Sequence, residues 1–252
     1  MRAVLLYSMA MAQQLDTDRH SVTQSNDLIE AAQTLTLNEK RLVLCMVGKL
    51  DPRKPILARG TVEIHADEFA ELYGIESRGH TYEALEDAAR GLYQRSIKTI
   101  RRGSKGNVER AVRWVWMAEY RQGEAKVILG PSPALLPYLT LLHERFTTYQ
   151  LRQIGGLNSF WAIRLYELLA QFRSMGTRAI PIDRFREMLD LTDKYDRIEA
   201  LKRRVIEPAI AQINAETDLR VSWKFIREGR SVSAVSFVFG IERQGKLPLD
   251  AP

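Results

Sequence analysis

Three consecutive basic side chains, Lys202, Arg203 and Arg204, are the residues in this chain best suited to chemistry. They lie within EALKRRVIEPAIAQIN, residues 199–214. An arginine can donate two hydrogen bonds to O6 and N7 of guanine, and any of the three can neutralise a phosphate. A charged run on a helix is most often only a solvated surface, so binding of nucleic acid needs support from the surrounding elements.

The spacing around these residues predicts one helix over residues 193–214. Its apolar stripe comprises Ile198, Leu201, Val205, Ala209 and Ile213. The opposite side carries Arg197, Ala200, Arg203, Arg204 and Glu207, with Lys202 at the edge of the stripe. The small Ala200 would let this face approach the floor of a DNA groove. Pro208 cannot donate to the carbonyl of Arg204, so we expect a bend there that tilts the basic half outward.

An internal repeat supplies the elements that must position this face. Residues 60–85 align without a gap on residues 176–201, at an offset of 116, and nine of the 26 positions are identical. Apolar character is kept at further positions, such as Ile75 and Leu191. A repeat of this kind predicts a duplicated structural unit.

Each copy predicts a helix-turn-helix followed by a β-hairpin. In the second copy the strands are residues 219–225 and 235–240, joined by the turn REGR; in the first they are 96–102 and 110–120, around the loop GSKGN. Thr36 and Glu39 predict a capping box for a leading helix, and residues 158–176 predict another that ends at Gly176. The fold class is therefore α+β, with two tandem winged-helix domains.

The expected domain limits follow from these units. Residues 1–21 would be a flexible leader that only loosely imitates a secretory signal, with Met9 or Met11 as a candidate true start. An N-terminal winged-helix domain would span 22–130, a C-terminal one 131–242, and a tail 243–252. GPSPALLPYL, with three prolines, is either the joint between the domains or a folded flap packed on one of them.

The first copy distributes its charge differently. The face that matches the basic face of the second copy carries His80, Glu83, Ala84, Asp87 and Arg90, which is nearly neutral. The hairpin instead has a charge of +5 over the 16 residues 98–113. Such a hairpin could follow a phosphate backbone or enter a minor groove, or its charge could only keep an edge soluble. We therefore expect base contacts mainly from the second domain, with positioning and self-association in the first.

Composition excludes several other classes. The formal charge of +6 and the pI near 9.5 suit a polyanionic partner, and the single cysteine, Cys45, fits a reducing cytoplasm. The four histidines are scattered, no phosphate-binding G-x-x-x-x-G-K-[ST] motif occurs, and no stretch is long and apolar enough to span a membrane. We expect no catalytic residues, no metal and no cofactor.

Several segments resemble a known family. VTQSNDLIEAAQTLTLNEKRLVL, LLPYLTLLHERFTTYQLRQI and the combination of IRLYELL with KRRVIEPAI are similar to the plasmid replication initiators of the Rep3 type, over residues 22–242. The resemblance implies binding as a monomer to direct repeats, called iterons, at a plasmid origin, and recruitment of the host initiator and the replicative helicase. It also implies a homodimer, formed mainly through the first domain, that binds an inverted-repeat operator and represses its own gene in the bacterial cytoplasm.

The candidate DNA-binding residues are chosen from the charge pattern together with the family resemblance. The resemblance places Lys202, Arg203 and Arg204 in the recognition helix. In the second domain they are Lys194, Arg197, Ala200, Lys202, Arg203, Arg204, Lys224, Arg227 and Arg230. In the first they are Arg78, His80, Lys98, Arg101, Arg102, Lys105 and Arg110. Three alternatives stay open: a winged-helix transcription regulator, a DNA-nicking replication enzyme, and a module that binds only proteins.

Overall fold

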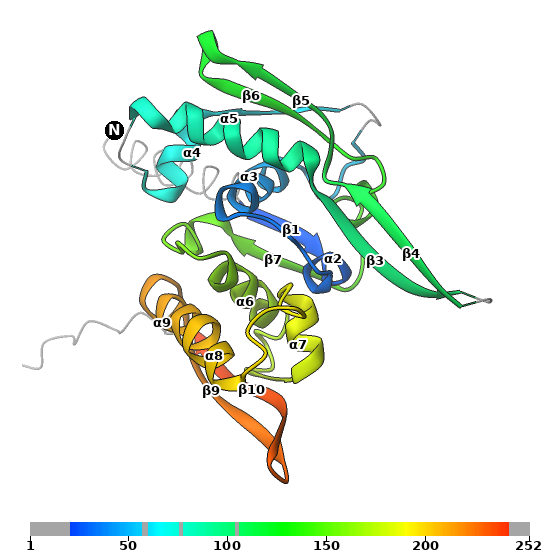
Figure 1. Cartoon of the computed structure of the whole chain (residues 1–252). Helices are drawn as coiled ribbons and strands as arrows, with labels where there is room; N and C mark the ends of the chain where they lie inside the picture. The colour runs from blue at the N-terminus through cyan, green and yellow to red at the C-terminus, as the bar shows by residue number, and fades with distance from the viewer. Residues whose placement is uncertain (1–20, 57–59, 76–77, 104–105, 242–252) are drawn as a thin grey trace, which may run out of the picture.

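The computed structural model describes residues 21–56, 60–75, 78–103 and 106–241 (Figure 1). Apart from Ser21, the leader expected at residues 1–21 lies outside this part of the chain, as does the tail expected at 243–252.

The first half of the chain contains both strands and helices. They are β1 Ser21–Ser25, α2 Asn26–Glu30, α3 Leu37–Gly48, β2 Val62–His65, α4 Ala66–Tyr73, α5 Arg78–Gln94, β3 Ser96–Gly103, β4 Gly106–Arg113, β5 Val115–Arg121 and β6 Lys126–Pro131. A connecting stretch follows, with short 3₁₀ turns and the strand β7 Phe146–Gln150. The second half contains α6 Phe160–Ala170, β8 Thr177–Pro181, α7 Ile182–Met188, α8 Ile198–Leu201, a π-helical turn Lys202–Ile206, α9 Glu207–Glu216, β9 Leu219–Glu228 and β10 Ser231–Ile241.

The aligned segments fold alike. In each copy a short strand leads into the first helix of a helix-turn-helix, and that strand becomes an edge of a three-stranded antiparallel sheet. The orders are β2-β6-β5 in the first copy and β8-β10-β9 in the second. The tandem winged-helix architecture in an α+β fold is therefore confirmed.

The prediction of the hairpin that would form the wing of the first copy is wrong in one respect. Residues 110–120 form two strands, because the chain changes partners at Trp114, whose side chain is fully buried. Its backbone N–H donates to the carbonyl of Arg95, and its carbonyl accepts from the N–H of Ser132. Among the described strands β4 pairs with β3 alone, whereas β5 pairs with β6, so β5–β6 is the topological equivalent of β9–β10.

The basic hairpin β3–β4 is consequently an additional element between α5 and the winged sheet, and it extends away from the body of the protein (Figure 1). The strand β6 was not predicted because all six of its residues are buried. A strand covered on both faces has no period-two pattern from which it can be recognised.

The proline-rich segment between the halves is folded, as the second of the two interpretations had it. Leu135 and Leu139 are buried in the core. Beyond them, β7 pairs antiparallel with β1, with Ser21 opposite Gln150, so the stretch before α6 lies beside the first described strand.

The leading helices differ in how well they were predicted. The capping box of α3 is present: the Thr36 N–H donates to Glu39 Oε2 at 2.8 Å, and the Glu39 N–H donates to Thr36 Oγ1 at 3.2 Å. The helix α6 ends at Ala170 rather than at Gly176, because residues 171–175 form turns. Gly176, with a φ of +67°, follows these turns and leads directly into β8.

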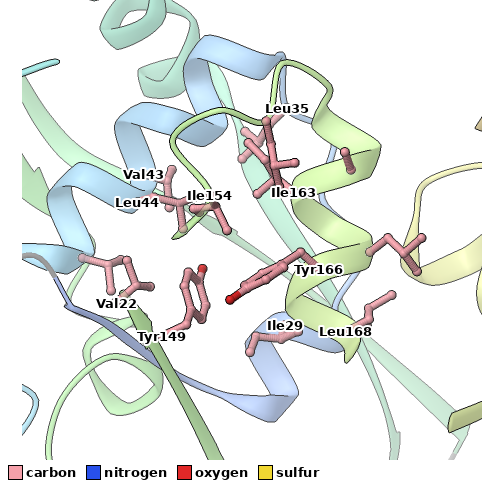
Figure 2. Close-up of a cluster of buried hydrophobic side chains, with 14 of the residues drawn as sticks. Val22, Ile29, Leu35, Val43, Leu44, Tyr149, Ile154, Ile163, Tyr166 and Leu168 are labelled. Carbon is pink, nitrogen blue, oxygen red and sulfur yellow. The ribbon is translucent and has the colours of Figure 1, made fainter. Parts of the chain in front are cut away.

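One hydrophobic core runs through both copies, with α6 near its middle. Figure 2 shows Tyr166 and Leu168 of α6 near Ile29 of α2, which packs against α6. The rings of Tyr149 and Tyr166 meet edge to face at 5.6 Å. Because α6 also packs against α9, the second helix of the helix-turn-helix in the second copy is supported by a scaffold shared with the first.

A buried charged cluster joins the two halves inside this core. Glu167 accepts from Lys40 Nζ and from Arg164 Nη1, each at 2.9 Å, and all three side chains are fully buried. The Arg164 guanidinium also donates to the carbonyls of Ile29, Ala31 and Met188. Burial lowers the pKa of Lys40 to about 8. Burial opposes ionisation of Glu167, but the two cations and the hydrogen bonds hold its pKa below the usual value.

Candidate nucleic-acid interface

The recognition helix of the second copy runs from α8 through the π-helical turn into α9 and is firmly attached to the core. Its predicted apolar stripe is confirmed, because Leu201, Val205, Ala209 and Ile213 are each at most 2% exposed. Ile198 packs partly buried against the same core. Ile206 and Ile210 are also buried, which widens the attached face beyond the predicted stripe.

The opposite face carries exposed basic side chains. Arg197, Arg203 and Arg204 are exposed, and Ala200 and Lys202 are partly exposed. Lys202 Nζ lies 3.8 Å from Glu207 Oε1, a weak contact at the surface. Within the part of the chain that the structure describes, the side chains of Arg203 and Arg204 form neither a hydrogen bond nor an ion pair. Both guanidinium groups therefore keep their donors available for a ligand.

The irregularity expected at Pro208 lies in the five residues before it. The turn Lys202–Ile206 is π-helical, and the Glu207 N–H donates to the carbonyl of Lys202, five residues back. Pro208 has no N–H for the carbonyl of Arg204, and its ring crowds that carbonyl, so the preceding turn widens. Arg203 and Arg204 lie within this wider turn, and π-helical turns inside α-helices are frequent at functional sites.

The helix begins five residues later than predicted. Residues 193–197 form a loop, in which Lys194 pairs with Asp190 at 3.0 Å, and Arg197 is the N-cap of α8. The Arg186 guanidinium of α7 holds the loop by donating to the carbonyls of Lys194 and Tyr195. Sequence periodicity missed this role because Arg186 resembles an ordinary helical surface residue.

The second hairpin also presents basic side chains. Lys224, Arg227 and Arg230 are exposed, the last two beside the tip at Gly229, where φ is +62°. The predicted alternation in β9 holds: Trp223 and Phe225 pack on the core side and meet edge to face at 5.0 Å. The hairpin β9–β10 projects beyond the body of the protein (Figure 1).

The helix α5 of the first copy has the nearly neutral face that the sequence predicts. His80 Nδ1 lies 3.1 Å from Glu83 Oε2, and Arg90 pairs with Glu86. Arg78 begins α5, but its side chain lies outside the described part of the structure. The basic residues of this helix are thus largely committed to its own carboxylates.

The basic hairpin β3–β4 is anchored at its base. Ile97 is buried and Val112 packs against the core, and both line a cleft of about 500 Å³ with Leu28, Leu135 and Arg184. Arg110 is exposed. Lys98, Arg101 and Arg102 lie on β3, but their side chains are outside the described part, and Lys105 is outside it altogether.

Chemistry of other kinds finds no support in the described residues. Among them, no group of three or more His, Cys, Asp or Glu side chains could hold a metal ion. Within the same residues, no helix has the length and apolarity needed to cross a bilayer. Cys45 is buried beside Tyr73, and burial raises the pKa of its thiol to about 12, so it is a poor nucleophile.

Comparisons with known proteins agree with this geometry. Residues 21–170 match the family described as "Initiator Replication protein, WH1", and residues 181–239 match "Initiator Rep protein, WH2". The chain belongs to the Rep3 family of plasmid replication initiators. The WH1 match extends beyond the limit of residue 130 expected for the first domain, and includes β7 and α6.

Individual relatives match most of the length of the chain. An "Uncharacterized 27.6 kDa protein" of Escherichia coli is 30% identical over 229 residues, covering 85% of this chain and 93% of that protein. A "Replication initiation protein" of Escherichia coli is 26% identical over 233 residues, covering 90% and 71%. The crystal structure described as "Pi initiator protein in complex with iteron DNA" matches with a TM-score of 0.76 at 23% identity, covering 89% of this chain and 98% of that chain. That likeness confirms the fold of both copies together.

Proposed function

We propose that this Rep3 initiator binds iteron repeats at a plasmid origin as a monomer, with the helix α8–α9 in the major groove. The observation that carries the proposal is the pair Arg203 and Arg204. Both are exposed and unpaired among the described residues, on a helix whose other side is fixed in the core. Arginine at such a position can make bidentate contacts with guanine, and the partly exposed Ala200 gives the bases room.

The remaining basic residues fit contacts to the phosphate backbone. Lys194 and Arg197 precede the recognition helix, and Lys224, Arg227 and Arg230 line its wing. In the first copy, Arg78 and His80 begin α5, while Lys98, Arg101, Arg102, Lys105 and Arg110 belong to the basic hairpin. Backbone contacts of this kind fix the register of a protein on DNA without themselves specifying sequence.

The first copy is also the proposed dimerisation unit. Trp116 on β5 and Tyr93 on α5 are 40% and 41% exposed, and β5 is an edge of its sheet. Exposed aromatic side chains and an open edge strand are both features that suit contact with a second copy of the chain. As a dimer the protein would bind an inverted-repeat operator and repress its own gene. As a monomer in the bacterial cytoplasm it would recruit the host initiator and helicase, without catalysing a reaction itself.

A plasmid transformation assay tests the proposal. A plasmid that carries the native origin should replicate only when this protein is supplied, and a footprint should show evenly spaced direct repeats. Replication without the protein, together with a single protected palindrome, would instead support a winged-helix transcription regulator.

A further inference from the structure

The loop that precedes the recognition helix differs between the two copies. By the offset of 116 residues, the start of α5 at residues 78–81 corresponds to residues 194–197. The former are helical, whereas the latter form the loop before α8. One turn of helix is therefore unwound in the second copy, at the end that carries Lys194 and Arg197.

Unwinding a helical turn frees backbone carbonyls that need new donors. Arg186 of α7 supplies them: its Nη1 lies 3.4 Å from the carbonyl oxygen of Leu191 and 2.9 Å from that of Lys194. Its Nη2 lies 2.8 Å from the oxygen of Tyr195 and 3.1 Å from that of Asp196. A planar guanidinium with five donors can span these acceptors, whereas a lysine ammonium cannot. The first copy has Ala70 at the matching position and keeps the turn helical.

The conformation of the loop requires such support. Asp190 and Tyr195 have φ angles of +56° and +55°, in the left-handed region that non-glycine residues seldom adopt. Residues held in this region are strained and persist only where neighbouring groups fix them. The ring of Tyr195 packs edge to face on Trp161 at 5.7 Å, and Lys194 pairs with Asp190. The Arg186 guanidinium is the group that binds the backbone of this loop directly.

We propose that Arg186 is a positioning residue for sequence recognition, which holds the unwound turn so that Lys194, Arg197 and the start of α8 meet the DNA in one register. The inference rests on the proposed function of that helix. Arg186 itself is not expected to touch the DNA, because its donors are directed at the loop carbonyls. Its loss should therefore lower discrimination between sequences more than it lowers general affinity for DNA.

The test compares two duplexes: one selected from a random-sequence library by the full wild-type chain, and one scrambled from it at equal composition. Arg186→Lys, which keeps the charge, should reduce the ratio of the two affinities about tenfold, the size of one lost base contact. Binding to the scrambled duplex should change less than about twofold, as expected for an unaltered phosphate contact. The control Arg184→Gln removes a charge from the same helix α7 without affecting the loop, and it should leave the ratio unchanged.

A second variant separates the effect of the loop from a general loss of the fold. Tyr195→Ala keeps the left-handed strain but removes the ring contact with Trp161, so it loosens the same loop while Arg186 stays in place. It should lower the ratio in the same way, with the unfolding midpoint of each variant reporting its fold. The inference would be overturned if folded Arg186→Lys kept the wild-type ratio of the two affinities. It would also be overturned if the variant lost affinity equally for both duplexes. A wild-type protein that selects no sequence would instead contradict the proposed function itself.

Discussion

Replacing Arg164 by methionine probes the buried cluster that joins the two halves of the protein. The change removes an ion pair with Glu167 at 2.9 Å and three hydrogen bonds to carbonyls, at 2.6 Å to Ile29, 3.0 Å to Ala31 and 3.1 Å to Met188. Breaking a buried pair by removing one partner costs about 3–5 kcal/mol, and each orphaned buried acceptor adds about 1–3 kcal/mol.

These costs do not simply add. Lys40 remains paired with Glu167 at 2.9 Å, and methionine fills part of the volume that the arginine leaves. We expect Arg164→Met to lower the free energy of unfolding by about 4 kcal/mol, near the middle of the range for a broken buried pair. For a chain of this size, that corresponds to a fall in Tm of about 8–16 °C.

Equilibrium unfolding in urea, followed by circular dichroism and extrapolated linearly, measures the change. The exposed Arg152, in the turn Leu151–Gln153, provides a matched control, and Arg152→Met should stay within about 0.5 kcal/mol of the wild type. A loss below about 1 kcal/mol for Arg164→Met would refute the reasoning, since a surface pair behaves in that way.

Three further predictions concern DNA binding and pH. Arg203→Ala should lose about 1–3 kcal/mol of discrimination at one or two base pairs in a competition assay, whereas equal loss on random DNA would reduce it to a phosphate contact. Three basic residues of the first hairpin can be neutralised together: Arg101, Arg102 and Lys105. This should flatten the slope of log affinity against log salt concentration by about 2–3. An unaltered slope would show that the hairpin does not contact the DNA. The folded-state pKa of Glu167 lies below its ordinary value of 4.5, so the unfolded state takes up more protons and stability should fall as pH drops below about 4.5. In urea titrations, Glu167→Gln should be less stable at neutral pH and show a flatter acid dependence; an equally steep decline would assign the acid sensitivity to other carboxylates.

Much of the architecture was predictable because it depends on local patterns of apolar and polar residues. The repeat at an offset of 116 residues predicted two similar units, and period-two alternation predicted β9. The 3.6-residue periodicity separated the buried Leu201 and Val205 from the exposed Arg203 and Arg204. These features depend on which side chains face water, and the periodicity of apolar and polar residues in the sequence indicates that directly.

The errors arise where tertiary contacts override local preference. Residues 193–197 have a helical pattern, yet Arg186 stabilises their carbonyls in a loop. The strand expected over 110–120 is divided because Trp114 is buried and bonded to two distant segments. The charged cluster around Glu167 joins α3 to α6, which are separated by more than 120 residues of sequence. A pairing over that distance cannot be predicted from any local pattern.

Protection of guanine N7 from methylation tests the central claim most directly, because it reports contacts in the major groove base by base. On the duplex selected by the wild-type chain, we expect one or two guanines in each repeat to be protected. Arg203→Ala or Arg204→Ala should expose one of them while backbone protection persists. If both variants left the guanine pattern unchanged, the recognition helix of the second copy would not be the element that contacts the bases.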